Sequence, residues 1–393
     1  MFFFALLIQK DRGKGPDDVL ASYPKSYSGV VLNPAPLKEI KISHPPAWAL
    51  WIKLNMRAMR IEEILKERIL VLDGAMGTMI QRHTLHEADF RGERFKEHGH
   101  TLKGNNDILS ITRPDIIKDI HRLYLEAGAD IAETNTFSGT TIAQADYHLD
   151  EAAVYLLNYQ SARIAREVAD EFTLLQPDKP RFVAGAMGPT NKTASLSPDV
   201  NNPGYRAISF DELAAAFKAQ AVALIDGGVD MLLLETVIDT LNVKAALFAI
   251  EELFEQLGKR IPVMVSGTIT DASGRTLSGQ TTEAFLISVS HIPLLSIGLN
   301  CALGASMLRP YLKVLSDKAP FFVSAYPNAG LPNEFGQYDE SPEHMGAQVE
   351  EFLKEGLVNI LGGCCGTTPA HIKVIADLAS KYKPRKVAEE VEV

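Results

Sequence analysis

Eight short apolar segments recur along this chain, and each one ends in small or polar residues before a stretch with helical spacing of apolar residues. Almost continuous apolar strands that alternate with helices are typical of a parallel sheet covered by helices. Eight such units predict an α/β fold of the (β/α)8 or TIM barrel type, whose chemistry takes place at the carboxyl ends of the strands. The predicted strands are 69–76, 129–137, 181–189, 229–237, 262–269, 294–302, 320–328 and 357–364.

Amphipathic helices are predicted between these strands, for example over 211–226, 241–257 and 343–355. A doubly wound parallel sheet is the alternative fold for the same alternation. The chain contains neither Gly-x-Gly-x-x-Gly after a strand nor Gly-x4-Gly-Lys-Ser/Thr, so nucleotide binding has no specific support.

The 393 residues fit one large barrel with additional segments at its ends. We predict an irregular N-terminal extension over 1–58, the barrel over 59–383 and a polar tail over 384–393. The extension contains several prolines and shows no steady hydrophobic period, and its apolar opening lacks the basic start of a secretory signal. Our hypothesis is that translation begins at Met56 or Met59, so that the extension is not native, which the intact mass of the natively expressed protein would test.

The composition limits which cellular compartments and which classes of partner suit the protein. A formal net charge of −10 argues against nucleic acid and anionic membrane surfaces as partners. No apolar run approaches the roughly 18 residues that cross a bilayer. An odd number of cysteines, three in a long chain, favours a reducing compartment, so we predict a cytoplasmic protein.

All three cysteines lie in glycine-rich segments at the ends of predicted strands: Cys301 in Gly-Leu-Asn-Cys-Ala-Leu-Gly, and Cys364 with Cys365 in Gly-Gly-Cys-Cys-Gly-Thr-Thr-Pro. Adjacent cysteines form a disulfide poorly, because their Cα atoms are about 3.8 Å apart and bridged pairs prefer roughly 5.5–6 Å. Three thiolates with an open fourth position are typical of a catalytic Zn²⁺. The alternatives are three packing cysteines or a redox pair, although the Cys-x-x-Cys spacing is absent.

A Zn²⁺ ion with three cysteinate ligands has a net charge of −1, which makes it a poor activator of water. The same centre binds a further thiol as its thiolate and leaves that sulfur electron-rich. Because a free thiol titrates near 8.5, only a small fraction of it is nucleophilic at neutral pH. The predicted reaction class is therefore alkyl transfer to a small thiol.

Several long motifs resemble the homocysteine S-methyltransferase family, and within it the homocysteine-binding module of cobalamin-dependent methionine synthase. The resemblance covers about residues 60 to 383 and implies the zinc-bearing barrel predicted above. The motifs are Asp73-Gly-Ala-Met-Gly-Thr, Lys103-Gly-Asn-Asn-Asp, Glu133-Thr-Asn-Thr-Phe, the run from Ser197 to Leu213, Ser324-Ala-Tyr-Pro-Asn-Ala-Gly-Leu-Pro-Asn and the two cysteine segments.

The resemblance also implies roles for individual residues. The zinc ligands would be Cys301, Cys364 and Cys365, with Asn328 as a displaceable fourth ligand unless it only stabilises its turn. Asp73 and Glu235 would hold the ammonium group of homocysteine, and the backbone at Gly74 would help to place its carboxylate. The alternative role of Asp73 is to cap the following turn.

Glu133 and the pair His83 and His86 are further candidates for the site. Glu133 is a lesser candidate for substrate binding, with a structural role as the alternative. His83 and His86 have a spacing that suits a metal, but we expect them to be solvated or structural because the thiols already complete a site.

The function that the resemblance implies is zinc-dependent methylation of homocysteine to methionine. Since the chain shows no segment of its own for a corrin or a pterin, we expect methylcobalamin to be supplied in trans by a separate corrinoid and methyltetrahydrofolate-binding methionine synthase component. The alternative donor is betaine, S-methylmethionine or another small onium compound. The alternative outside enzymes is a zinc- or redox-sensing barrel. The oligomeric state is left open.

Overall fold

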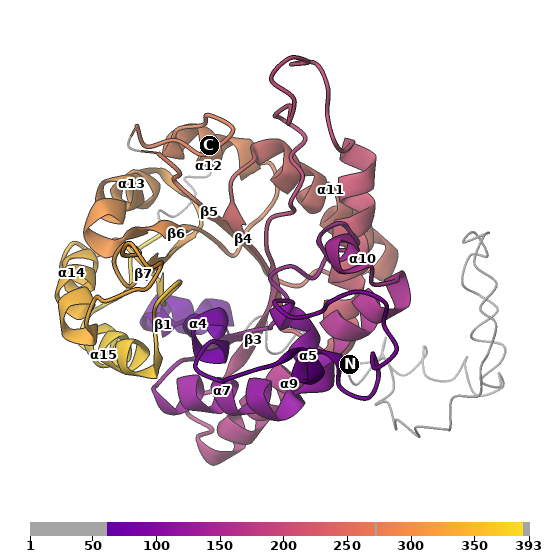
Figure 1. The fold of residues 1–393 in the computed structure, drawn as a ribbon. Helices are drawn as coiled ribbons and strands as arrows, with labels where there is room; N and C mark the ends of the chain where they lie inside the picture. Colours follow the sequence, from indigo (N-terminus) through magenta and orange to yellow (C-terminus); the bar gives the residue numbers. More distant parts are fainter. Residues whose placement is uncertain (1–60, 272, 388–393) are drawn as a thin grey trace, which may run out of the picture. The chain divides into compact units, whose positions relative to one another are not determined.

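The structure, a computed structural model, describes residues 61–271 and 273–387. In them, eight parallel strands pair in the order β1-β8-β7-β6-β5-β4-β3-β2, and a bridge between Leu72 and Ile131 joins the two ends of the sheet. Figure 1 shows the strands as a ring with helices around it. The strands are β1 Leu70–Val71, β2 Ile131–Glu133, β3 Phe182–Met187, β4 Met231–Val237, β5 Val263–Gly267, β6 Ser296–Gly304, β7 Phe322–Asn328 and β8 Ile360–Leu361.

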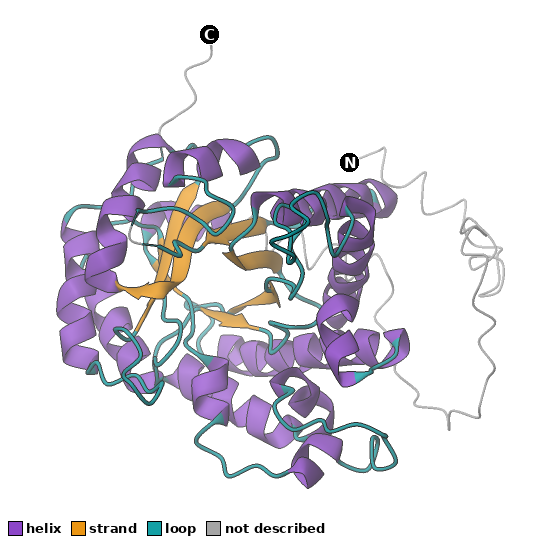
Figure 2. Cartoon of the chain, turned by 45° about the horizontal axis from the view of Figure 1, so that its top comes forward, coloured by secondary structure: helices purple, strands orange, loops and turns teal. Residues whose placement is uncertain are grey.

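The helices lie outside the strands, as Figure 2 shows from a second direction. Residues 61–67 are also helical. The helices are α4 Met76–Ile80, α5 Glu87–Arg91, α6 Leu109–Thr112, α7 Pro114–Glu126, α8 Thr141–Gln144, α9 Glu151–Leu175, α10 Phe210–Gly227, α11 Thr240–Leu257, α12 Thr282–Val289, α13 Ala305–Lys318, α14 Pro342–Lys354 and α15 Pro369–Ala379, with short 3-10 turns η1 Asn106–Ile108 and η2 Ala145–Tyr147.

The prediction of a (β/α)8 barrel is confirmed, and each predicted strand contains or overlaps an observed one. The largest difference is at β1 and β8, each of which is only two residues long. The polar and glycine residues that end those segments leave the sheet and turn over the carboxyl end of the barrel, so that they are free to form a site there.

Two apolar layers hold the barrel together. One fills its interior with side chains such as Leu70, Phe182 and Met264, and the other lies between the strands and the helices. Helix starts are stabilised by side-chain caps; at α10, the Ser209 hydroxyl accepts the Glu212 N–H and Glu212 accepts the Ser209 N–H. Both layers are expected from the predicted alternation of apolar strands with amphipathic helices.

Two predicted segments flank the barrel, the N-terminal extension and the polar tail. The predicted extension, 1–58, lies outside the described residues. The predicted tail begins at 384, yet Arg385 is buried and its guanidinium donates to the carbonyl oxygens of Ser316, Ala319 and Phe321. The first residues of this tail therefore pack on the barrel. Within the described ranges, none of the helices combines the length and the apolar character that crossing a bilayer requires.

Candidate active site

Cys301 lies in a bulge at the end of β6. The pairing of β6 with β7 shifts in register between Asn300 and Gly304, and both Cys301 and Ala302 have positive φ, 60° and 56°. Residues with side chains rarely adopt such angles, and bulges often redirect a side chain beside an active site. The bulge turns this segment away from regular strand geometry at the residue that carries the thiol.

The Cys364–Cys365 pair is held in a tight turn after β8. The Cys364 N–H donates to the Pro327 carbonyl at 2.9 Å, and the Ala329 N–H donates to the Cys365 carbonyl at 2.9 Å, so β7 supports both residues. The Thr367 hydroxyl donates to the Cys364 carbonyl at 2.7 Å. These bonds fix the backbone that presents both thiols.

The three sulfur atoms converge, as predicted. Cys365 Sγ lies 3.8 Å from Cys301 Sγ and 4.0 Å from Cys364 Sγ, and all three lie within 4.8 Å of one another. A tetrahedral Zn²⁺ with Zn–S bonds of about 2.3 Å separates its sulfur ligands by about 3.8 Å. The observed spacing therefore fits a zinc ion, and among the described residues this is the single acid, histidine or cysteine cluster close enough to hold a metal.

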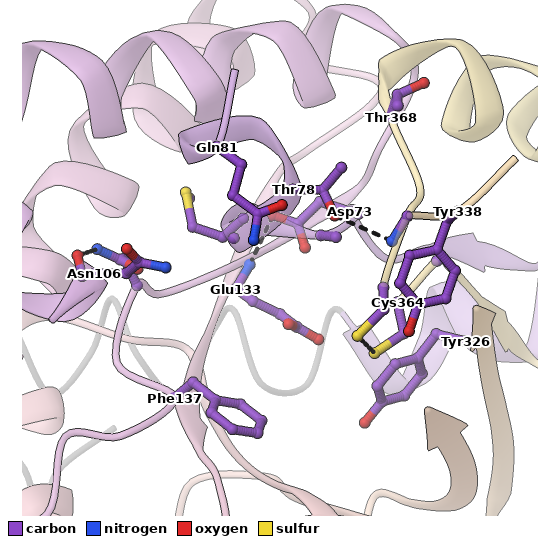
Figure 3. Close-up of a pocket in the computed structure, with 18 of the residues that line it drawn as sticks. Asp73, Thr78, Gln81, Asn106, Glu133, Phe137, Tyr326, Tyr338, Cys364 and Thr368 are labelled. Carbon is purple, nitrogen blue, oxygen red and sulfur yellow. Dashed lines mark hydrogen bonds between the residues drawn. The ribbon is translucent and has the colours of Figure 1, made fainter. Parts of the chain in front are cut away.

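The protonation of the thiols is coupled. Hydrogen bonds from Cys301 and Cys364 lower the pKa of Cys365 to about 3, and the bonds that Cys364 shares with Cys301 and Cys365 raise the pKa of Cys364, as does its burial. The three thiols therefore affect one another's acidity, and Cys365 is the most acidic of them. Burial, and then Cys365, raise the pKa of Tyr338, whose side chain lies beside Cys364 in Figure 3.

Asn328, the predicted fourth ligand, is the last residue of β7. It lies between Pro327, whose carbonyl accepts the Cys364 N–H, and Ala329, whose N–H donates to the Cys365 carbonyl. Its side chain is buried, and its Oδ1 atom has no hydrogen-bond partner among the described residues. An unsatisfied buried acceptor is costly. A cation at the thiols would satisfy it, and this role for Asn328 remains a prediction.

Three acidic side chains, Asp73, Glu133 and Glu235, line a cavity of about 990 Å³ that also reaches Cys364 and Cys365. Asp73 Oδ2 accepts the Glu133 N–H at 3.0 Å, whereas Asp73 Oδ1 and Glu133 Oε1 have no partner among the described residues. Figure 3 shows Glu133 pointing into this cavity, with Cys364 on one side and Phe137 and Asn106 on the other.

Asp73 and Glu235 are buried and Glu133 is half-buried, and no basic residue of the described chain pairs with them. Burial raises the pKa of Asp73 and of Glu133, and Glu235 raises both further. Burial also raises the pKa of Glu235 to about 8, against a smaller lowering by the Thr236 hydroxyl. A carboxyl group that is buried without a basic partner either keeps its proton, as these raised pKa values indicate, or pairs with a cation. A ligand with an ammonium group would supply it.

These pKa values predict how stability depends on pH. Glu235 holds its proton up to about pH 8 in the folded protein and releases it near pH 4.5 in the unfolded chain. Between these values the folded state binds more protons, so the free energy of unfolding falls as the pH rises. We expect the melting temperature of the ligand-free protein to fall from pH 5 to pH 8, and Glu235→Gln to flatten that fall. An equal slope in both proteins would contradict the assignment.

Gly74 has a packing role in the structure. A Cβ atom at this position would lie 2.7 Å from Tyr124 Cε1 and 2.9 Å from Thr367 Oγ1, so the two side chains leave room only for glycine. The neighbouring Ala75 N–H donates to Thr367 Oγ1 at 3.1 Å. The predicted contact of this backbone with a substrate carboxylate remains a prediction.

The two histidines of the first loop stay apart from the thiols. His83 and His86 are both exposed, and neither belongs to the metal-compatible cluster. Sequence reasoning did not single out Asn300, which contacts Cys364, or Tyr338, which lies in the loop between β7 and α14. Adjacency to Cys301 was a signal for Asn300, whereas no pattern in the sequence places Tyr338.

Gly366 offers a test of the cysteine turn. Its φ is +81°, and a Cβ atom there would lie 2.3 Å from Tyr338 Cβ. We expect Gly366→Ala to lower the free energy of unfolding by about 2–4 kcal/mol, from left-handed backbone strain and overpacking, and to weaken metal retention. Gly356→Ala is the matched control, because φ is +63° there and a Cβ atom would have no described neighbour within 4 Å. Urea unfolding of both variants measures the difference; equal losses would contradict the contact with Tyr338.

Comparisons with known proteins agree with this geometry. The model of the homocysteine S-methyltransferase family matches residues 70–379. The metallated form of the homocysteine methyltransferase MmuM from Escherichia coli has 24% identity and a TM-score of 0.62 over 82% of this chain and 99% of that chain. Its oxidized form gives the same TM-score over 98% of that chain, and its apo form gives 0.58 at 23% identity. At these identities, the similarity to MmuM establishes the fold.

Proposed function

Because the chain belongs to the homocysteine S-methyltransferase family and is thus a methyltransferase acting on homocysteine, we propose that Cys301, Cys364 and Cys365 hold a zinc ion at which the substrate thiol reacts. The observation that carries this proposal is the convergence of the three Sγ atoms at spacings that suit tetrahedral zinc. When bound there, Zn²⁺ supplies ionisation of the homocysteine thiol at neutral pH.

The acidic side of the cavity is proposed to bind the amino-acid end of homocysteine. Asp73 and Glu235 would receive the ammonium group, with Glu133 beside them, and the backbone at Gly74 would face the carboxylate. Asp73 Oδ1 and Glu133 Oε1 are buried and have no hydrogen-bond partner among the described residues, which supports the assignment. Asn328 would leave the metal when the substrate sulfur arrives. Holding both ends of homocysteine orients its sulfur for reaction, and orientation is a large part of the rate enhancement in such a step.

We propose methylcobalamin on a separate corrinoid protein as the methyl donor, supported by the runs that resemble methionine synthase at Lys103, Ser197 and Ser324. The homocysteine sulfur forms the new S–CH₃ bond with its own electron pair. The electrons of the broken Co–C bond stay on cobalt, so methionine and cob(I)alamin result. The product thioether carries no charge on sulfur.

A small onium compound is the second candidate donor, and one observation favours it. Asp107 is a fourth buried acid that lines the same cavity, and burial raises its pKa to about 7 despite a hydrogen bond from the Ser138 N–H. An amino-acid substrate brings one ammonium group to this acidic cavity. A cationic donor would bring a second positive charge and leave as a neutral amine or thioether after transfer.

The test uses reduced, zinc-loaded protein with homocysteine and, in separate reactions, free methylcobalamin, a methylated corrinoid protein, betaine and S-methylmethionine. Methionine formed only from the corrinoid donors would support the first donor, and methionine formed from an onium compound would support the second. X-ray absorption at the zinc edge should detect one additional sulfur neighbour with homocysteine. Zinc without that neighbour and without any turnover would favour a zinc- or redox-sensing barrel.

A further inference from the structure

Asn300, at the end of β6, is fully buried and contacts both parts of the site. Its Nδ2 atom donates to Thr236 Oγ1 at 2.8 Å and to Cys364 Sγ at 3.9 Å. Its Oδ1 atom accepts the Thr236 N–H at 3.0 Å and the Ser266 hydroxyl at 2.7 Å. One amide thus joins the ends of β4, β5 and β6 to the turn after β8.

The contacts with Thr236 bear on the acidic side of the cavity. Thr236 has a φ of +52°, an angle that a β-branched residue adopts only under constraint. Asn300 bonds to two polar groups of this residue, the N–H and the hydroxyl. Glu235 directly precedes Thr236, and the Thr236 hydroxyl donates to Glu235 Oε2 at 3.4 Å. Asn300 therefore holds the residue that contacts the Glu235 carboxyl.

The other contacts bear on the thiols. The Nδ2–H···Sγ bond reaches Cys364, and Asn300 is directly followed by Cys301, whose own φ is +60°. The Asn300 carbonyl accepts the Thr268 hydroxyl at 3.0 Å, which fixes the backbone where the bulge begins. Asn300 therefore contacts the Cys364 thiol through its side chain, and its fixed backbone helps to position Cys301.

We propose that Asn300 is a positioning residue that fixes the distance between the thiol centre and the carboxyl group that binds the ammonium of the substrate. Loss of the Asn300 contacts would then change two properties together: the affinity for zinc and the preference for thiol substrates that carry an amino group. The inference rests on the proposed function, since it takes zinc at the thiols and an ammonium at Glu235. Nothing in it depends on the identity of the methyl donor.

The test compares Asn300→Asp with Asn359→Asp. The first variant keeps the Oδ1 acceptor but replaces the donor that faces Thr236 and Cys364 with a carboxylate oxygen. Asn359 is a matched control, because it is fully buried, its Oδ1 accepts the Val323 N–H at 3.0 Å and its Nδ2 donates to the Arg385 carbonyl at 2.7 Å. Both variants lose one buried donor, so both should lose thermal stability.

Two readouts separate positioning from stability. Competition with a chelator measures zinc affinity, and binding of homocysteine against 4-mercaptobutyrate, which lacks the amino group, measures ammonium selection. Asn300→Asp is expected to weaken zinc binding by about 10–100-fold, as losses of outer-shell partners do, and to reduce the preference for homocysteine about tenfold. Asn359→Asp should change neither.

Unchanged zinc affinity and unchanged thiol preference in Asn300→Asp would overturn the inference, as would equal changes in both variants. If Asn300→Asp does not fold, Thr236→Val replaces it. That variant removes the hydroxyl that accepts from Asn300 Nδ2 and donates to Glu235 Oε2 at 3.4 Å, and so breaks the link between the two residues. It should reduce the preference for homocysteine while zinc affinity stays; an unchanged preference would overturn the inference. Failure of the unaltered protein to bind zinc would overturn the proposed function and this inference together.

Discussion

Cys301→Ser is expected to abolish methyl transfer to homocysteine, with a rate loss of about 10³-fold or more, equivalent to at least about 4 kcal/mol of barrier. The variant removes one of three converging sulfurs and leaves Cys364 and Cys365 as an incomplete centre. A serine hydroxyl is a much weaker acid than a thiol and a harder ligand, so it does not replace a thiolate on zinc. Zinc content and the rate of methionine formation measure the effect together.

Ala302→Gly is the control for the strained bulge. Ala302 follows Cys301 and shares its positive φ, so glycine there keeps the backbone shape without the steric cost. This control should retain zinc and turnover. Full activity of Cys301→Ser, or zinc loss in Ala302→Gly equal to that in Cys301→Ser, would contradict the assignment of the metal ligand.

Glu235→Gln is expected to raise the KM for homocysteine by about 10–100-fold, because a hydrogen bond to a charged group contributes about 1.5–3 kcal/mol. The amide keeps the shape of the side chain but loses the negative charge that pairs with the substrate ammonium. The zinc content should stay unchanged. Steady-state kinetics at several pH values would show the effect growing toward pH 8, since in the unaltered protein the free carboxyl group ionises only near that pH.

A substrate analogue makes this prediction specific. The KM for 4-mercaptobutyrate, which has no ammonium group, should change little in Glu235→Gln. Asp107→Asn is the comparison variant, because Asp107 is also a buried acid in the same cavity. It should retain the preference for homocysteine. Equal losses for both substrates in Glu235→Gln would mean that the carboxyl group acts on cavity shape instead of on the ammonium.

The barrel and its metal centre could be predicted because their signals are local or topological. The eight apolar segments are visible as runs of buried residue types, and strand order follows from right-handed parallel connections. Cys301 and the Cys364–Cys365 pair then meet because β6 and β8 both flank β7. Strand ends were less accurate, as at β8, where the observed strand is only Ile360–Leu361 within the predicted segment 357–364.

The acidic site could be predicted only in part from the sequence. Asp73 and Glu235 each follow an apolar strand, which marks them as residues at the edge of the barrel. Their protonation depends on burial, which a sequence does not display, and on other groups across the cavity: Glu235 raises the pKa of Asp73, and Cys365 and Asp107 raise the pKa of Glu235. Asp107, in the turn η1 before α6, joins the same cavity although nothing in its motif indicates burial.

The sequence by itself determined the strand count, the helical cover and which strand ends carry thiols and carboxyl groups, because hydrophobic period and residue type are properties of short segments. Tertiary structure alone decided the strained angles at Thr236 and Cys301, the contact between Tyr338 and the cysteine turn, and the bonds of Asn300 to Thr236 and Cys364. These features arise where segments far apart in the chain compete for the same space and the same hydrogen-bonding groups, and that competition exists only after the barrel has closed.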